Sequence, residues 1–313
     1  MSPFLIFLVV LAAIMVLIIG AYLIAGHLIF ELAFARRISK KEKMIVDNFS
    51  IKVINDIGFI NEQKLEEVFI RSDDGIKLAA KYITNPIKSN RYVIFLHHYR
   101  GNGFDEFNVS AHTFYDKGFN LFFIEERGNI NSGGKYFTIG PKEKEDVYSW
   151  IKYLVSQDKD SEILLFGHLM GAHIVLLALS YNLPSNVKCV IADSGYNSLD
   201  DQLLYAAHDR LKIKKAKIVV TIGETYAIFM HKMHFDETVQ KSVFKNQIPV
   251  CLIHDTTDDL VPSYNLDIIY NSFDKDCYVE KHSFEGITHY SNERKDLHRY
   301  SEIITSFSEK FIK

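Results

Sequence analysis

The sequence contains few cysteines and no pattern of paired ones. Its three cysteines, Cys189, Cys251 and Cys277, lie in or beside apolar stretches. An odd number of cysteines on apolar runs does not fit a disulfide framework, which needs paired residues at suitable spacing. We therefore expect all three to be small, buried and chemically inert side chains.

An excess of charge of either sign is also missing. The 36 Lys and Arg residues nearly balance the 39 Asp and Glu residues, which leaves a formal net charge of −3. Nucleic-acid-binding domains usually carry a basic patch, often interleaved with aromatic residues, and the sequence has none. The composition therefore argues against nucleic acid as a partner.

A metal-binding motif is lacking as well, so we expect neither a metal nor another cofactor. Metal sites need His, Cys or carboxylate ligands at recognisable spacing. The histidines near predicted strand ends and loops (His97, His98, His254 and His289) have no such spacing, and His231 and His234, one helical turn apart, are expected to pack or to face solvent.

Charged residues are absent from the N-terminus between Pro3 and Gly26. A run of about 24 residues at ~1.5 Å each is long enough to cross a ~30 Å hydrocarbon core. No basic residue precedes the run, and the run is long for a cleavable signal peptide. The basic residues that follow favour the cytoplasmic side of a cell membrane for the rest of the chain, as a single-pass protein. These residues are Arg36, Arg37, Lys40, Lys41 and Lys43.

The remaining residues are numerous enough for one large catalytic-size domain. Hydrophobic residues make up 48% of the 313-residue chain, and an α/β domain of ~250 residues commonly stays undivided. We expect a membrane anchor over residues 1–30, a juxtamembrane connector over 31–66, and one domain over 67–313. An insertion with helical periodicity covers about 199–247.

Apolar runs alternate with amphipathic stretches along the domain. This order predicts an α/β fold with a mostly parallel sheet flanked by helices. The predicted strands are Val68–Arg71, Lys77–Ile83, Val93–His97, Leu121–Glu125, Ile163–Phe166, Cys189–Ala192, Val250–His254 and Tyr278–His282, and the predicted helices are Lys142–Val155, Met170–Tyr181 and Tyr300–Phe311.

One segment has the form of a strand-turn-helix elbow, G-x-S-x-G, without its serine. Gly167 and Gly171 flank a position occupied by Leu169, whose side chain has no nucleophilic atom. The two glycines are expected where the turn packs so closely that a side chain would clash. The elbow is therefore expected to form even though the serine is absent.

Two later segments supply an acid and a base in the chain order Ser, Asp, His. The predicted strand Val250–His254 runs into D-T-T-D-D-L-V-P, which is similar to an H-G-x-x-D-x-x-V-P acid loop and makes Asp258 the expected acid. The segment G-I-T-H-Y, residues 286–290, is similar to a G-x-x-H loop and makes His289 the expected base.

Other segments complete the pattern. H-H-Y-R-G-N (97–102) is similar to an H-G-Y-x-G-N segment, and E-E-R-G-N (125–129) to a D-x-R-G-H loop. Together with the elbow, these segments make the chain resemble a membrane-anchored bacterial α/β-hydrolase of the serine aminopeptidase-like group, from about Glu67 onward. The resemblance implies an oxyanion hole made by the backbone amides of Tyr99 and Met170, and a lid in the insertion where ligand choice resides.

The resemblance implies serine hydrolysis of ester or peptide bonds, but Leu169 removes the attacking atom. Three further departures suggest a site released from hydrolysis: His98 beside the oxyanion amide, Asp255 near Asp258, and Asn129 with Ile130 in a loop expected to be loosened. Ser194, at the end of a predicted strand, is expected to be a structural hydroxyl.

Three functions remain open. The first is a membrane-anchored pseudoenzyme that binds an acyl or peptide ligand or has a regulatory role. The second is an active hydrolase that uses some retained route. The third is a non-covalent acid-base enzyme that uses His289 and Asp258.

Overall fold

The computed structural model describes residues 2–36, 59, 63–99, 101, 106–129, 131–285 and 296–313. Its residues pack as two units: Met1–Ala35 with Asp200–Asp236, and Arg36–Leu199 with Glu237–Lys313. Most of the expected connector, 31–66, lies outside the described residues, as do four of the five expected basic residues after the anchor. These four are Arg37, Lys40, Lys41 and Lys43.

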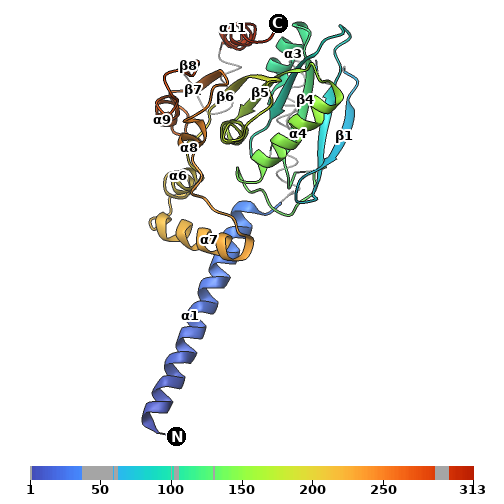
Figure 1. The fold of residues 1–313 in the computed structure, drawn as a ribbon. Helices are drawn as coiled ribbons and strands as arrows, with labels where there is room; N and C mark the ends of the chain where they lie inside the picture. Colours follow the sequence, from blue (N-terminus) through green and yellow to red (C-terminus); the bar gives the residue numbers. More distant parts are fainter. Residues whose placement is uncertain are drawn as a thin grey trace. The chain divides into compact units, whose positions relative to one another are not determined.

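A mixed, mostly parallel sheet forms the larger unit, as the alternating pattern predicted (Figure 1). Its strand order is β1-β2-β4-β3-β5-β6-β7-β8. The two pairs that involve β2 are antiparallel and the other neighbours are parallel. The strands are β1 (Glu66–Arg71), β2 (Lys77–Ile83), β3 (Arg91–Leu96), β4 (Asn120–Glu125), β5 (Glu162–His168), β6 (Val187–Asp193), β7 (Val250–Asp255) and β8 (Val279–Phe284).

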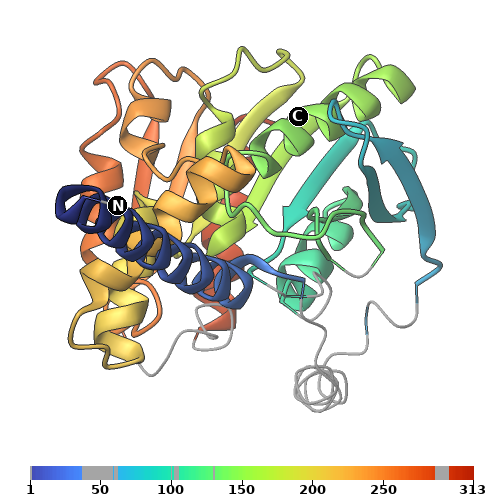
Figure 2. The ribbon, with the colours of Figure 1, turned by 90° about the horizontal axis from the view of Figure 1, so that it is seen from below.

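Helices cover both faces of the sheet, which explains why its central strands are apolar on both sides. Figure 2 shows helices on the two faces. On one face Phe123 belongs to a core cluster with residues of α3 and α11, and on the other Phe122 packs against Trp150 of α4. The helices of this unit are α3 (Asn108–Asp116), α4 (Glu143–Gln157), α5 (Met170–Ala178), α8 (Val239–Val243), α9 (Tyr264–Tyr270) and α11 (Leu297–Ser308).

The predicted elements differ from the observed ones mainly at their ends. Strand β3 ends at Leu96 and leaves His97 outside, whereas β5 continues to His168 and thereby reaches the elbow. Helix α5 ends at Ala178, not Tyr181, because the N–H groups of the next three residues donate to carbonyls three, and not four, residues earlier. Helices α3 and α9, which are only nine and seven residues long, were not predicted.

The smaller unit is helical. It contains α1 (Pro3–Phe34), α6 (Leu199–Tyr205), a π-helical turn η2 (Ala206–Arg210) and α7 (Ala216–His231). By length and composition α1 can cross a membrane, a test that a signal sequence also passes. The helical periodicity expected for the insertion therefore agrees with the observed helices.

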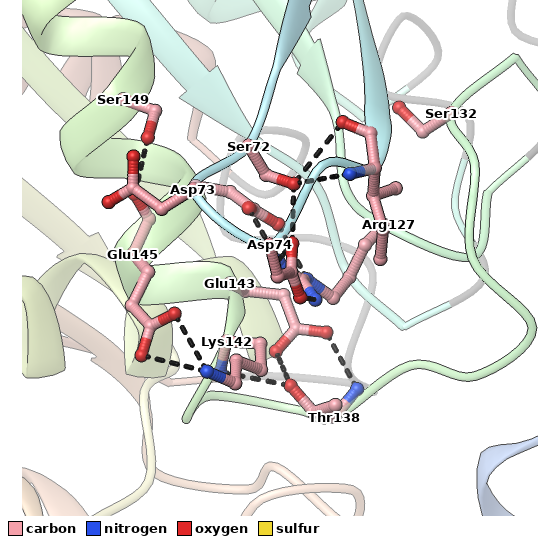
Figure 3. Close-up of polar contacts among 12 residues, drawn as sticks. Ser72, Asp73, Asp74, Arg127, Ser132, Thr138, Lys142, Glu143, Glu145 and Ser149 are labelled. Atoms are coloured by element: carbon pink, nitrogen blue, oxygen red, sulfur yellow. Dashed lines mark hydrogen bonds and ion pairs between the residues drawn. The ribbon is translucent and has the colours of Figure 1, made fainter.

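A buried arginine joins the loop after β1 to the helix after β4. The Arg127 guanidinium donates two hydrogen bonds of 2.7 Å to Asp146 of α4 and further ones to Asp74, the shorter at 2.8 Å (Figure 3). Nearby, the carboxylate of Glu143 accepts hydrogen bonds from the backbone N–H groups of Thr138 and Gly140, which fixes the turn before α4. The buried Arg127 thereby ties Asp74, in the turn of the antiparallel edge, to the helix layer.

We expect Arg127→Met to lower the free energy of unfolding by about 3–5 kcal/mol, because it leaves the buried Asp146 carboxylate unpaired. Lys142→Met is the matched control. Lys142 pairs with Glu145 at the surface, so its loss should change the free energy by less than about 1 kcal/mol. Urea denaturation of the full chain in detergent, followed by circular dichroism, measures both. Equal effects of the two substitutions would contradict the proposed role of Arg127.

The same network predicts a pH dependence. Hydrogen bonding to Arg127 lowers the pKa of Asp74 from 3.8 to about 2. A folded-state pKa below the unfolded one means that the ionised carboxylate stabilises the fold above about pH 4 and loses this effect as the pH falls towards 2. The difference in melting temperature between the wild type and Asp74→Asn should therefore shrink as the pH is lowered from 4 to 2. A difference that stays constant over this range would exclude the pairing.

Candidate active site

The segment between β5 and α5 is a sharp strand-turn-helix elbow. Leu169, at its tip, has φ 51° and ψ −109°, a conformation that bulky residues rarely adopt. Its N–H donates to the carbonyl of Asp193 at 2.8 Å, and its carbonyl accepts from the N–H of His173 at 3.1 Å. Such strain, of about 1–3 kcal/mol, persists only where the surroundings impose it.

The two flanking glycines explain what imposes that conformation. A Cβ atom on Gly167 would overlap the carbonyl of Gly171, and one on Gly171 would overlap the carbonyl of Leu96 on β3. The close approach predicted from the G-x-x-x-G spacing is therefore confirmed. Strand β3, the elbow and α5 pack backbone to backbone, and this contact holds Leu169 at positive φ.

The two residues expected to supply the amides of an oxyanion hole follow neighbouring strands at the same edge of the sheet. Leu96 pairs with Gly167 in the parallel register of β3 and β5, so Tyr99 and Met170 each lie three residues beyond a matched pair. Met170 is the first residue of α5, where backbone N–H groups have no partner within the helix. The Tyr99 ring packs edge-on against Phe137, with centroids 5.4 Å apart.

The expected acid, Asp258, is buried and oriented by its own loop after β7. Its Oδ1 atom accepts hydrogen bonds from the backbone N–H groups of Leu260 at 2.7 Å and Val261 at 2.9 Å. Its Oδ2 atom has no hydrogen-bond partner among the described residues. A buried carboxylate oxygen without a partner is costly, so this geometry suits a carboxylate that accepts from a further donor.

The expected base, His289, lies outside the described residues, as does the rest of the segment from Gly286 to Tyr290. Among the described residues, the imidazole of His254 lies close to Asp258, with its Nε2 atom 3.8 Å from Oδ2. That nitrogen is 3.0 Å from the carbonyl of Val261, so it donates there as an N–H. The His254 side chain therefore stabilises the loop that carries Asp258.

A buried glutamate that the sequence analysis missed lies beside the elbow. The Glu106 carboxylate accepts the backbone N–H of His98 at 2.8 Å and contacts the His98 imidazole. His168, at the end of β5, has its Nδ1 atom 3.6 Å from the same carboxylate. Burial by itself raises the pKa of Glu106, but the imidazoles of His98 and His168 lower it well below its usual range. The His98 side chain is thus held by Glu106.

A second buried pair joins the loops after β3 and β4. His97 contacts the carboxylate of Glu126, and although burial lowers the pKa of His97, this carboxylate raises it above its usual value. The amide of Asn129 lies 2.8 Å from His97 Nε2 and donates to the carbonyl of Gly101, also at 2.8 Å. The expectation that Asn129 loosens its loop is therefore wrong, because its amide ties the two loops together. Ile130 lies outside the described residues.

Asp255, expected to add a charge near Asp258, makes its described side-chain hydrogen bonds with the turn that follows. Its Oδ1 atom accepts the backbone N–H of Thr257 at 2.7 Å and the hydroxyl of the same residue at 2.8 Å. This is the geometry of a turn stabilised by an aspartate side chain. Asp255 therefore shapes the loop that carries Asp258.

Ser194 has the structural role that its position predicted. It is buried, and its hydroxyl donates to Oδ1 of Asp193 at 3.0 Å. The other oxygen of Asp193 accepts the hydroxyl of Tyr300 at 2.7 Å. The hydroxyl of Ser194 therefore joins a buried chain of hydrogen bonds that links β6 to α11.

Away from the elbow, one group of side chains consists of residue types that can bind a metal ion. Cys251, Glu280 and His282, on β7 and β8, offer atoms within 4.8 Å of one another. The Lys310 ammonium already lies 2.5 Å from a Glu280 oxygen, and burial raises the pKa of the Cys251 thiol well above its usual value. The cluster is thus an ion pair beside a neutral thiol. All three cysteines are free and buried, as predicted.

Comparison with solved structures identifies the architecture. An esterase from Pyrococcus furiosus, Pf2001, superposes with a TM-score of 0.67 at 21% identity, over 83% of this chain and 94% of the esterase. The acylaminoacyl peptidase of Pyrococcus horikoshii gives 0.60 at 18% identity, over 83% of this chain and 44% of the peptidase. The chain has the α/β-hydrolase fold.

Sequence comparison adds little to the α/β-hydrolase fold. No family model matches the chain. The Bacillus subtilis protein YqkD is 23% identical over 200 residues, which cover 63% of this chain. The chain spans 64% of the length of that relative.

The elbow of this α/β-hydrolase fold predicts a graded response to added methyl groups. We expect Gly171→Ala to destabilise the fold by about 3 kcal/mol or more, because the methyl group meets a backbone carbonyl that cannot move aside. The control is Gly195→Ala, where the nearest atom is a side-chain methyl at 3.2 Å and a small shift suffices. Thermal unfolding in detergent compares the two variants, and a Gly171→Ala variant as stable as the control would refute the close packing.

Proposed function

We propose that this chain is a membrane-anchored α/β-hydrolase-fold protein whose site binds an acyl or peptide ligand without serine hydrolysis. The observation that carries the proposal is Leu169 at the tip of an elbow whose backbone keeps the strained conformation. In this fold the elbow tip is where the nucleophilic serine resides. A leucine there has no atom that can attack a carbonyl.

The loss of turnover expected without a nucleophile is so large that it favours a binding role over slow catalysis. Removing the nucleophile from an unrelated serine hydrolase costs on the order of 10⁶ in turnover. Leu169 is also only 4% exposed, so its side chain fills space that an acyl carbon would need. The protein is therefore expected to bind or regulate, with the hydrolase site as its ligand pocket.

The retained acid supports one alternative, a non-covalent acid-base enzyme. Asp258 is buried with one oxygen capped by two backbone N–H groups and the other left for a donor. In the fold, that donor is the imidazole expected at His289, with Asp258 holding its tautomer. Such a pair can move protons without a serine. The structural similarity to an esterase and a peptidase supports hydrolysis as the ancestral reaction.

Membrane anchoring is the second part of the proposal. Most side chains of α1 between Phe4 and Ile24 are large, apolar and exposed, which is costly in water and favourable in lipid. The basic residues that follow the span, beginning with Arg36, favour the cytoplasmic side for the larger unit.

A fluorophosphonate probe, which labels activated serines, tests the lost nucleophile. We expect no labelling of the full-length wild type or of Leu169→Ala. Leu169→Ser should gain labelling on the order of 10²-fold or more over Leu169→Ala, because the elbow already has the required backbone. Adding Asp258→Asn to Leu169→Ser should remove most of this gain.

Hydrolysis of short acyl esters by the same variants, with His289→Ala added, separates the alternatives. Wild-type turnover equal to that of Leu169→Ser would overturn the proposal. Turnover that survives Leu169→Ala but is lost in His289→Ala would instead establish the non-covalent enzyme.

A further inference from the structure

Helix α7 packs directly on the end of α1, through glycines that let the two backbones come close. A Cβ atom on Gly26 would lie 2.6 Å from Cβ of Tyr226, and one on Gly223 would lie 2.7 Å from Cγ2 of Ile29. Small residues at a crossing point are the usual way in which helices approach closely in membranes. The contact belongs to one packed unit of the chain.

Aromatic contacts extend this interface towards the end of α1. The Phe30 ring stacks on His231 with centroids 4.1 Å apart and planes 3° apart, and Phe34 contacts Phe235 at 5.4 Å. Phe30 and Phe34 are almost completely buried, unlike the apolar side chains earlier in α1. The protein contacts of α1 are therefore concentrated in its last turns.

The position of this contact along α1 sets the depth of α7. From Pro3 to Gly26 the helix rises about 35 Å at ~1.5 Å per residue, slightly more than the ~30 Å thickness of a hydrocarbon core. When α1 spans a bilayer, the residues that contact α7 lie where the core ends. Helix α7 is then held at the boundary between lipid tails and headgroups.

The outward surface of α7 suits that boundary. Ile218 and Phe229 lie on one side of the helix and are 55% and 78% exposed. The side that faces α1 carries the small residues Ala216, Gly223 and Ala227, which are buried. An exposed apolar stripe opposite a packed one needs a further apolar partner.

Basic residues lie at both ends of this stripe. Residues 209–232 carry six basic side chains and two acidic ones. All six basic side chains are exposed. Interfacial helices that lie on anionic membranes combine an apolar face with such a basic margin. The six are Arg210, Lys212, Lys214, Lys215, Lys217 and Lys232.

From these observations we infer that the apolar stripe of α7 (Ile218 and Phe229) docks into the surface of an anionic lipid bilayer. The inference goes beyond the ligand-binding role and rests on the proposed membrane anchoring by α1. The contact with α1 holds the stripe at the depth where the hydrocarbon core ends, and the basic margin matches the charge of anionic headgroups. Helix α7, which belongs to the expected lid insertion, thereby lies at the membrane surface.

The test places an environment-sensitive thiol label at one position at a time in the full chain. The native cysteines are buried, so labelling is selective for an introduced cysteine. Phe229→Cys reports on the stripe, and Ile218→Cys replaces it if that variant misfolds. Thr221→Cys, exposed on the polar flank of α7, is the matched control, and Leu17→Cys reports on insertion of α1.

The labelled proteins are reconstituted in vesicles of phosphatidylcholine with phosphatidylglycerol. We expect spin-labelled lipid to quench the label at 229 at least about threefold more than the label at 221, and aqueous iodide to show the reverse order. Replacing both Lys214 and Lys215 by Glu should weaken the lipid quenching at 229.

Each other result overturns the inference in a distinguishable way. Equal iodide quenching at 229 and 221 would mean that the stripe faces water. Protection at 229 from both quenchers would mean that protein covers it, either the larger unit or a second copy. Absence of lipid quenching at position 17 would refute the anchoring itself, and the docking of α7 with it.

Discussion

The close approach of three backbones at the elbow is the constraint on which the candidate site depends. Strand β3, the turn at Gly167 and the first turn of α5 meet where neither glycine has room for a side chain. At this contact residue 169 has positive φ although its side chain is a bulky leucine. The elbow therefore persists with a leucine at its tip, because the constraint lies in the neighbouring glycines and in the Leu96 carbonyl.

Around the elbow, buried charges hold the loops at the edge of the sheet. Glu106 pairs with His98 after β3, and Glu126 pairs with His97 across to the loop after β4. Buried carboxylates and imidazoles that pair with one another hold loops rigidly, since breaking one partner leaves the other uncompensated. Loops held in this way keep their positions without the reaction, which is what the proposed binding role requires.

Much of the fold followed from local pattern. The apolar runs that became β4, β5 and β7 are continuous because both faces of the sheet are covered by helices. Their order predicted the mostly parallel sheet, and the resemblance to the α/β-hydrolase fold agrees with the solved structures it superposes on. The short helices α3 and α9 escaped prediction, since nine or fewer residues carry little periodic signal.

Within the candidate site, the sequence by itself determined the elbow, through two glycines four residues apart, and the position of Asp258 after a buried strand. The apolar run that became α1 also needs no partner to be recognised, because its length and lack of charge are local properties. Only the tertiary structure decided that Glu106 and Glu126 are the partners of two adjacent histidines, and that α7 packs on α1. These contacts join residues far apart in the chain, and no local periodicity records which distant side chain fills a buried space or satisfies a buried charge.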